Sequence, residues 1–174
     1  MSGRKQNQLK LDLHPSWINQ DLIEKLKSSD FQLIVRYFVI NTPDKGTSAR
    51  GVEIAEYGIA DENDLFQELM DGITYVTKKQ TIEVEDLESV GLSLFPPTVL
   101  DERVCFAVSN NKPVTSLFIK IRDSLAHGRF NFGGSKKMAY LIMEDINSRD
   151  NCSARMVLKF ATMKRWIEKL ERNK

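Results

Sequence analysis

Residues 113–128 constrain the fold more than any other part of the chain. Pro113 suits the first turn of a helix, and Gly128 is the residue type that most often ends a helix in the left-handed conformation. Between them, apolar residues recur at the spacing i, i+3, i+4, i+7 and i+11, which predicts a single apolar stripe. The stripe consists of Val114, Leu117, Phe118, Ile121 and Leu125. We therefore expect a helix over residues 113–127 with one side packed against a core.

Other segments carry weaker helical signals. Apolar residues at helical spacing, Pro at a first helical position and Ser, Thr or Asp at cap positions indicate further helices. We place these helices at residues 15–27, 31–40, 64–79, 98–108 and 154–171. Residues 41–50, which contain Pro, Gly and Ser, are expected to form a loop. Residues 81–94 are ambiguous, with room for a short helix.

A β-hairpin is expected between the last two helices. Polar and apolar residues alternate over residues 129–132, Gly133 and Gly134 indicate a turn, and residues 138–145 are strand-like. The expected fold class is therefore mainly α, a bundle of five or six helices with a small β-hairpin before the last helix. We expect residues 1–174 to form a single domain, with residues 1–14 as a flexible N-terminal segment.

Composition narrows the class of protein. The chain contains no apolar run near the roughly 20 residues that a membrane helix requires, and its N-terminus lacks the apolar region of a signal peptide. We therefore expect a cytoplasmic protein with no membrane contact. Cys105 and Cys152 are expected to be free thiols, because a reducing compartment keeps such residues unpaired. With two Cys and two His in all, the chain predicts no metal site, and we expect no cofactor.

Charge is spread unevenly along the chain. Residues 53–103 carry 13 acidic and 3 basic side chains, a net −10, whereas residues 104–174 carry 14 basic and 6 acidic side chains, a net +8. The basic part can bind a polyanion such as RNA. Alternatively, the two parts attract each other within the fold or across an oligomer. The charge pattern alone favours neither reading.

One face of the 113–127 helix is polar. At 100° per residue, its members lie opposite the apolar stripe. This face consists of Lys112, Ser116, Lys120, Asp123 and His127, with Arg122 on its flank. Asp123 and His127 are i, i+4 neighbours, so their side chains can meet and fix the orientation of the imidazole.

Arginine and histidine together suit phosphodiester chemistry. Imidazole can take or give a proton near neutral pH, and guanidinium binds phosphate through two parallel hydrogen bonds. Arg122 and His127 lie about 140° apart on an ideal helix, so one helix brings them poorly onto one phosphate. A second copy of the helix, related by a two-fold axis, could place both pairs in one cleft. The competing interpretation is structural, with His127 as an exposed helix-end residue and Arg122 in a surface ion pair.

The motif resembles the signature of the HEPN superfamily. That signature is Arg-x4-6-His near the end of a helix, often with Asn, Asp or His after the Arg, and this chain has Arg122, Asp123 and His127. The sequence IRDSLAHGRFNF, residues 121–132, is similar to small bacterial and plasmid-borne HEPN proteins, as are ARMVLKF and RWIEKL in the last predicted helix. The specific match covers residues 113–132.

The resemblance implies a helical bundle that forms a homodimer through the 113–127 helix and cleaves RNA without a metal. It implies that Arg122 binds the scissile phosphate, that His127 activates the 2′-hydroxyl or protonates the leaving oxygen, and that Asp123 orients one of them. Further candidate RNA contacts are Lys120, Ser124 and Arg129.

Active members of the superfamily act as toxins, phage-defence or stress ribonucleases, which implies an antitoxin or a defence protein as partner. One subgroup carries Tyr two residues after the His, where this chain has Arg129, so control through that Tyr is not implied. Other members have lost activity and bind RNA or a protein. A structural helical domain with no role in nucleic-acid binding is the third reading.

Overall fold

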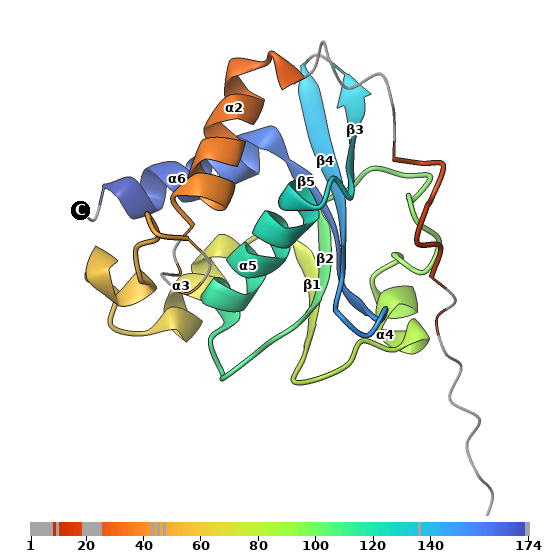
Figure 1. The fold of residues 1–174 in the computed structure, drawn as a ribbon, viewed down its shortest axis with the longest axis horizontal. Coiled ribbons are helices and arrows are strands. Elements are labelled where there is room, and N and C mark those ends of the chain that lie inside the picture. Colours follow the sequence, from red (N-terminus) through yellow and green to blue (C-terminus); the bar gives the residue numbers. More distant parts are fainter. Residues whose placement is uncertain are drawn as a thin grey trace, which may run out of the picture.

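The chain folds as a five-stranded mixed sheet with helices on both faces (Figure 1). The computed structural model describes residues 9, 11–18, 26–42, 44, 46, 48–135 and 137–172. The strands are β1 (Thr74–Lys78), β2 (Arg103–Ala107), β3 (Phe130–Ser135), β4 (Met138–Ile146) and β5 (Cys152–Lys159). The α-helices are α2 (Ser29–Val35), α3 (Glu62–Leu69), α4 (Val84–Ser89), α5 (Pro113–Ala126) and α6 (Phe160–Glu171). Two further helical elements are the π-helix η1 (Arg36–Ile40) and the 3-10 helix η2 (Ile54–Tyr57).

The strand order is β1-β2-β5-β4-β3. β1 and β2 are parallel, with Thr74 opposite Arg103, and α4 lies in the connection between them. The remaining neighbours are antiparallel. β3 and β4 form the predicted hairpin, in which Phe130 lies opposite Met143, so its existence is confirmed. The turn predicted at Gly133 and Gly134 is wrong, because both residues lie within β3 and pair with Tyr140 and Ala139. The hairpin is not an appendage of a helical bundle, because β4 pairs with β5 and so belongs to the central sheet.

The prediction of a mainly α fold is wrong. Three segments predicted as helices contain strands: residues 64–79 hold α3 and then β1, residues 98–108 hold β2, and residues 154–171 hold β5 and then α6. β2 and β5 are interior strands with both faces buried. Such strands show no clean alternation of polar and apolar residues, and periodicity alone does not separate them from buried helix.

The last segment shows how a strand came to resemble a helix. In β5, Ala154, Met156 and Leu158 face one side of the sheet, while Arg155 and Val157 face the other. Phe160 and Met163 belong to the apolar side of α6. Val157 stands three residues before the first and six before the second, so in the sequence alone the helical spacing of α6 extends back into the strand. The true boundary lies at Lys159, whose extended backbone precedes the helix.

Several expected elements are confirmed. α5 buries its whole predicted stripe, α2 and η1 together form the helix expected over residues 31–40, and α4 is the short helix within residues 81–94. The helix expected over residues 15–27 falls mostly on residues 19–25, which lie outside the described residues, as do residues 1–8 and 10 of the expected flexible segment.

The sheet separates two apolar cores. The large core lies under α2, η1, α3, α5 and α6 and includes Phe118 and Trp166, whose rings stack with centroids 6.2 Å apart. The small core, on the other face, lies under α4 and the chain after it, and it contains Leu87, Leu92 and Cys105. We call this second side the far face of the sheet. No helix in the described part of the chain is both long and apolar enough to cross a membrane.

The two thiols provide a test of this packing. Burial raises the pKa of Cys105 from 9.0 to about 12, and that of Cys152 likewise to about 12. Because the thiolate is the reactive form, neither residue of the native protein should react with a disulfide reagent at pH 8, and both should react after denaturation. Stoichiometric labelling of the native protein would contradict the packing.

The same shifts predict a dependence of stability on pH. Between about pH 9 and pH 12 the thiols of the unfolded chain ionise while those of the folded chain keep their protons, so the free energy of unfolding should fall as pH rises. A variant carrying both Cys105→Ala and Cys152→Ala should lose stability less steeply over this range. Urea unfolding at each pH measures the two slopes, and equal slopes would contradict the shifts.

Candidate functional site

The C-terminal end of α5 is closed by a specific turn. Gly128 has φ +69°, its N–H donates to Leu125 O at 3.2 Å, and the N–H of Arg129 donates to Ser124 O at 2.8 Å. These two bonds form a Schellman motif, which requires a left-handed residue after the cap and therefore favours glycine. His127 is the cap residue itself, so the turn leaves its side chain at the helix end, and Arg129 immediately precedes β3.

The three motif residues lie together at this end, with a different pairing from the one expected. Arg122 Nη1 donates to Asp123 Oδ1 at 2.5 Å, and the two side chains are 28% and 22% exposed. Arg122 Nε is buried and has no hydrogen-bond partner among the described residues. His127 is exposed, and among the described residues its imidazole donates no hydrogen bond to Asp123, whose carboxylate accepts from Arg122. Asp123 therefore orients the arginine rather than the histidine.

The polar face predicted for α5 is closed at its middle, whereas Lys112 and His127 at its two ends are exposed. Lys120 pairs with the buried Asp145 at 3.1 Å, Ser116 bonds to Ser109, and Ser124 is fully buried with its hydroxyl donating to Lys120 O. Lys120 is thus engaged within the chain, and Ser124 has no surface with which to contact RNA. The half-buried and exposed residues of α5 are Thr115, Ile119, Lys120, Arg122, Asp123 and Ala126.

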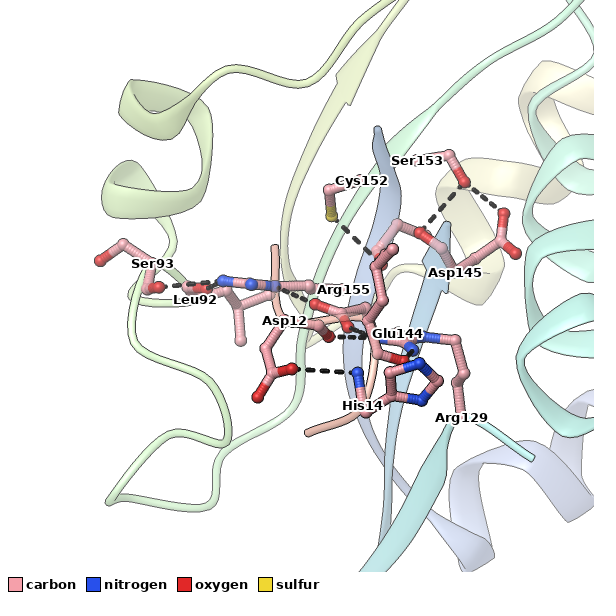
Figure 2. Close-up of polar contacts among 12 residues, drawn as sticks. Asp12, His14, Leu92, Ser93, Arg129, Glu144, Asp145, Cys152, Ser153 and Arg155 are labelled. Carbon is pink, nitrogen blue, oxygen red and sulfur yellow. Dashed lines mark hydrogen bonds and ion pairs between the residues drawn. The ribbon is translucent and has the colours of Figure 1, made fainter. Parts of the chain in front are cut away.

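Arg129 takes part in a buried charge network on the far face (Figure 2). Its Nη2 pairs with Glu144 of β4, whose other oxygen accepts from Arg155 Nε at 2.8 Å. Glu144 is 3% exposed, so one carboxylate lies buried between two guanidiniums. Arg155 also binds the chain that follows α4, because its Nη1 donates to Leu92 O at 3.0 Å and to Ser93 O at 2.9 Å.

Sequence reasoning missed this network. Glu144 and Asp145 stand in the strand-like run YLIMEDI, where two adjacent acids must point to opposite faces of a strand. The available signal was that both acids continue an apolar run in a predicted strand, and a buried charge needs a partner. The network was not predicted because Arg155 had been assigned to a helix.

The charge asymmetry of the sequence is partly resolved within the fold. Basic residues of the C-terminal part pair with acids from elsewhere, which supports the reading that the parts attract each other. These pairs are Lys159–Glu102 at 3.5 Å, Lys164–Asp30 at 2.7 Å and Lys169–Glu68. The last helix is therefore a poorer polyanion surface than its basic residues alone suggest.

Comparison with known proteins assigns no family to the chain. No family model, no curated protein and no solved structure matches the chain. Among the described residues, no group of three or more His, Cys, Asp or Glu side chains is placed to hold a metal ion.

The Schellman turn generates a test. An added Cβ at Gly128 would meet no atom within 4 Å, so the only cost of Gly128→Ala is the left-handed backbone. We expect a loss of about 1 kcal/mol in the free energy of unfolding, and a smaller loss for Gly128→Asn, because Asn tolerates this conformation better. Urea unfolding of both variants measures the difference, and an Ala variant as stable as wild type would contradict the geometry.

Proposed function

We propose that the protein is an endoribonuclease of the HEPN type that needs no metal and acts in the cytoplasm as a toxin, defence or stress ribonuclease. The observation that supports this most is that three residues suited to the chemistry lie within six positions at the C-terminal end of α5. Arg122 is partly exposed and oriented by Asp123, while His127 is exposed at the cap. The proposal rests on these residues and not on the helical bundle of that superfamily, from which this fold differs.

The chemistry follows from the side chains. The 2′-hydroxyl of RNA attacks the adjacent phosphorus, a new P–O bond forms, and the bond to the 5′-oxygen of the next nucleotide breaks. His127 takes the proton of the 2′-hydroxyl or supplies one to the leaving oxygen. Arg122 binds the non-bridging oxygens and stabilises the charge that grows on them. The products are a 2′,3′-cyclic phosphate and a 5′-hydroxyl.

A homodimer would complete the site. One copy holds one Arg122 and one His127, on different sides of the same helix end. The strip from Thr115 to Ala126 is the part of α5 that a second copy can still reach, because the rest of the helix is packed within the chain. A two-fold axis through this strip would bring two such ends together. An antitoxin or a defence protein would be a further partner.

One observation favours a second candidate, a non-catalytic module that binds RNA or a protein. Lys120 and Arg129 are both engaged in ion pairs, which leaves the helix end with fewer free cations than the sequence suggested. Weak phosphate binding suits a partner-binding module better than an efficient nuclease.

Cleavage of single-stranded RNA in EDTA tests the first candidate. Wild type should release products with a 2′,3′-cyclic phosphate, and His127→Ala should lower the rate by about 100-fold or more, because a general acid–base contributes at least that much. Arg149→Ala, at a residue in an exposed turn, is the control and should keep full activity. Equal rates for wild type and His127→Ala would reject the mechanism.

Mixing two inactive variants tests the composite site. Arg122→Ala and His127→Ala should each be inactive alone, and mixed dimers should regain part of the activity because they still hold one intact Arg122 and one intact His127. Arg149→Ala, in an exposed turn, replaces Arg122→Ala in the control mixture and should be active by itself. A mixture as inactive as its components, in a protein shown to exchange subunits, would place the whole site in one chain.

A further inference from the structure

Strand β1 forms one edge of the sheet, and its outer side is open. The N–H of Thr74 donates to Glu102 O at 3.2 Å, so alternate residues of β1, beginning with Thr74, bond to β2. The N–H and C=O groups of Tyr75 and Thr77 therefore point away from the sheet. Among the described residues, none of these four main-chain groups has a hydrogen-bond partner.

The opposite edge of the sheet, at β3, is closed. The outward N–H of Phe132 donates to Asn131 Oδ1 at 2.7 Å, and Asn131 Nδ2 donates to Trp17 O of the N-terminal segment. Gly134, with φ +82°, interrupts the extended backbone near the end of the strand. Covering segments and backbone irregularities are common protections of edge strands. In the described part of the chain, β1 has no such covering.

A lysine within an edge strand also discourages pairing, but the lysine of β1 is neutralised. Lys78 Nζ pairs with Asp86 Oδ1 of α4 at 2.8 Å. This ion pair holds the side chain towards α4 and cancels its charge. Lys78 therefore gives the edge little repulsion towards a basic strand.

Two acidic helices flank this edge, one on each face of the sheet (Figure 1). On the face of the large core, Tyr75 Oη donates to Gln67 Oε1 of α3 at 3.1 Å, and Asp64 lies one helical turn before Gln67 on the same side of α3. On the far face, the pair between Lys78 and Asp86 joins β1 to α4.

The region around the edge is strongly negative. Residues 61–89, which comprise α3, β1 and α4, carry nine acidic and two basic side chains, a net −7. The acids are Asp61, Glu62, Asp64, Glu68, Asp71, Glu83, Glu85, Asp86 and Glu88.

This charge selects the occupant of the edge. A second copy of the chain would bring an equal negative charge to the same place, and RNA is also negative, so both are repelled. A segment rich in Lys and Arg is attracted instead. Extended segments bind open sheet edges through main-chain hydrogen bonds, and the two donors and two acceptors of Tyr75 and Thr77 are placed for such bonds.

We propose that the β1 edge binds an extended basic segment of a partner protein, which adds a sixth strand to the five-stranded sheet. The main chain of that segment pairs with Tyr75 and Thr77, and its Lys or Arg side chains lie beside the acids of α3 and α4. The surface does not include α5, so the proposal does not depend on the proposed ribonuclease activity.

Residue-specific hydrogen exchange tests the main-chain pairing. The probe is a peptide of roughly nine residues that alternates Lys or Arg with Val or Thr, used at low salt, where charge attraction is strongest. With the peptide bound, the amides of Tyr75 and Thr77 should exchange at least several-fold more slowly. The amide of Val76, which already bonds to β2, should change less. No binding of the peptide, or bound peptide that leaves both outward amides unprotected, would overturn the proposal.

The same measurement without peptide detects a second copy. Protection of Tyr75 and Thr77 that increases with protein concentration would show that two β1 edges pair with each other. That result would overturn the proposal of a basic partner.

Two further peptides separate pairing from charge attraction. A version of the probe with Pro at its central positions keeps the charge and lacks the main-chain donors, so it should bind at least several-fold more weakly. A version with Glu in place of every Lys and Arg should not bind. A proline version that binds as tightly as the probe would contradict strand addition.

A charge reversal on the protein tests the role of the flanking acids. Asp64→Lys should weaken binding of the basic probe several-fold and strengthen binding of the Glu version, a reversal that damage to the fold would not produce. Asp12→Lys, at an exposed residue by the opposite edge of the sheet, is the matched control and should change neither affinity. If Asp64→Lys left both affinities as in wild type, the charge argument would be wrong.

A substitution in the strand tests the edge itself. Thr77→Pro removes an outward donor and no bond to β2, which is the place where an edge strand tolerates proline. It should weaken binding of the basic probe several-fold, whereas Thr77→Val should bind as wild type does. Circular dichroism and thermal unfolding of both variants show whether the fold is kept, and a folded Thr77→Pro protein that binds normally would contradict the proposal.

Discussion

Glu144 is the residue on which the arrangement of the far face depends. Its carboxylate lies almost wholly buried between Arg129 and Arg155, and each arginine then binds main-chain carbonyls of a different segment. Arg155 holds the chain after α4 at Leu92 and Ser93, and Arg129 holds the N-terminal segment at Asp12 and Leu13. A buried charge is stable only where partners satisfy it. Through its two arginines, one carboxylate therefore fixes both segments that pack on the far face, the N-terminal one and the chain after α4.

The same network connects to the end of α5. The Schellman turn leaves His127 at the cap, and Arg129 immediately precedes β3, with its guanidinium fixed by Glu144. On the other side of β4, Asp145 pairs with Lys120 and bonds to Ser153, which ties the middle of α5 to the sheet. Two adjacent acids on β4 thus anchor the motif helix and the residue that follows it, and this gives the motif a rigid support.

The sequence predicted well those features that depend on local signals. The α5 helix, its apolar stripe and its glycine stop follow from Pro113, the spacing of the apolar residues and Gly128, and the hairpin follows from alternation around Gly133 and Gly134. The sheet could not be predicted in the same way, because β2 and β5 are buried on both faces and their apolar runs resemble buried helix. The engagement of Lys120 could not be predicted either, since it depends on Asp145 of β4, and the burial of Ser124 depends on tertiary packing that local spacing does not reveal. The sequence correctly placed the motif residues at one helix end. It predicted the wrong partner for Asp123, because the i, i+4 spacing pointed to His127 whereas the carboxylate pairs with the adjacent Arg122.

The most direct test of the account is the stability of Glu144→Gln. The substitution keeps the shape of the side chain and removes the charge between two buried guanidiniums, so the free energy of unfolding should fall by about 3 kcal/mol or more. Glu168→Gln, which alters an exposed pair with Arg172 at 3.9 Å, is the matched control and should change it by less than about 0.5 kcal/mol. Urea unfolding of both variants makes the comparison. A Glu144→Gln protein as stable as the control would contradict the central place given to this carboxylate.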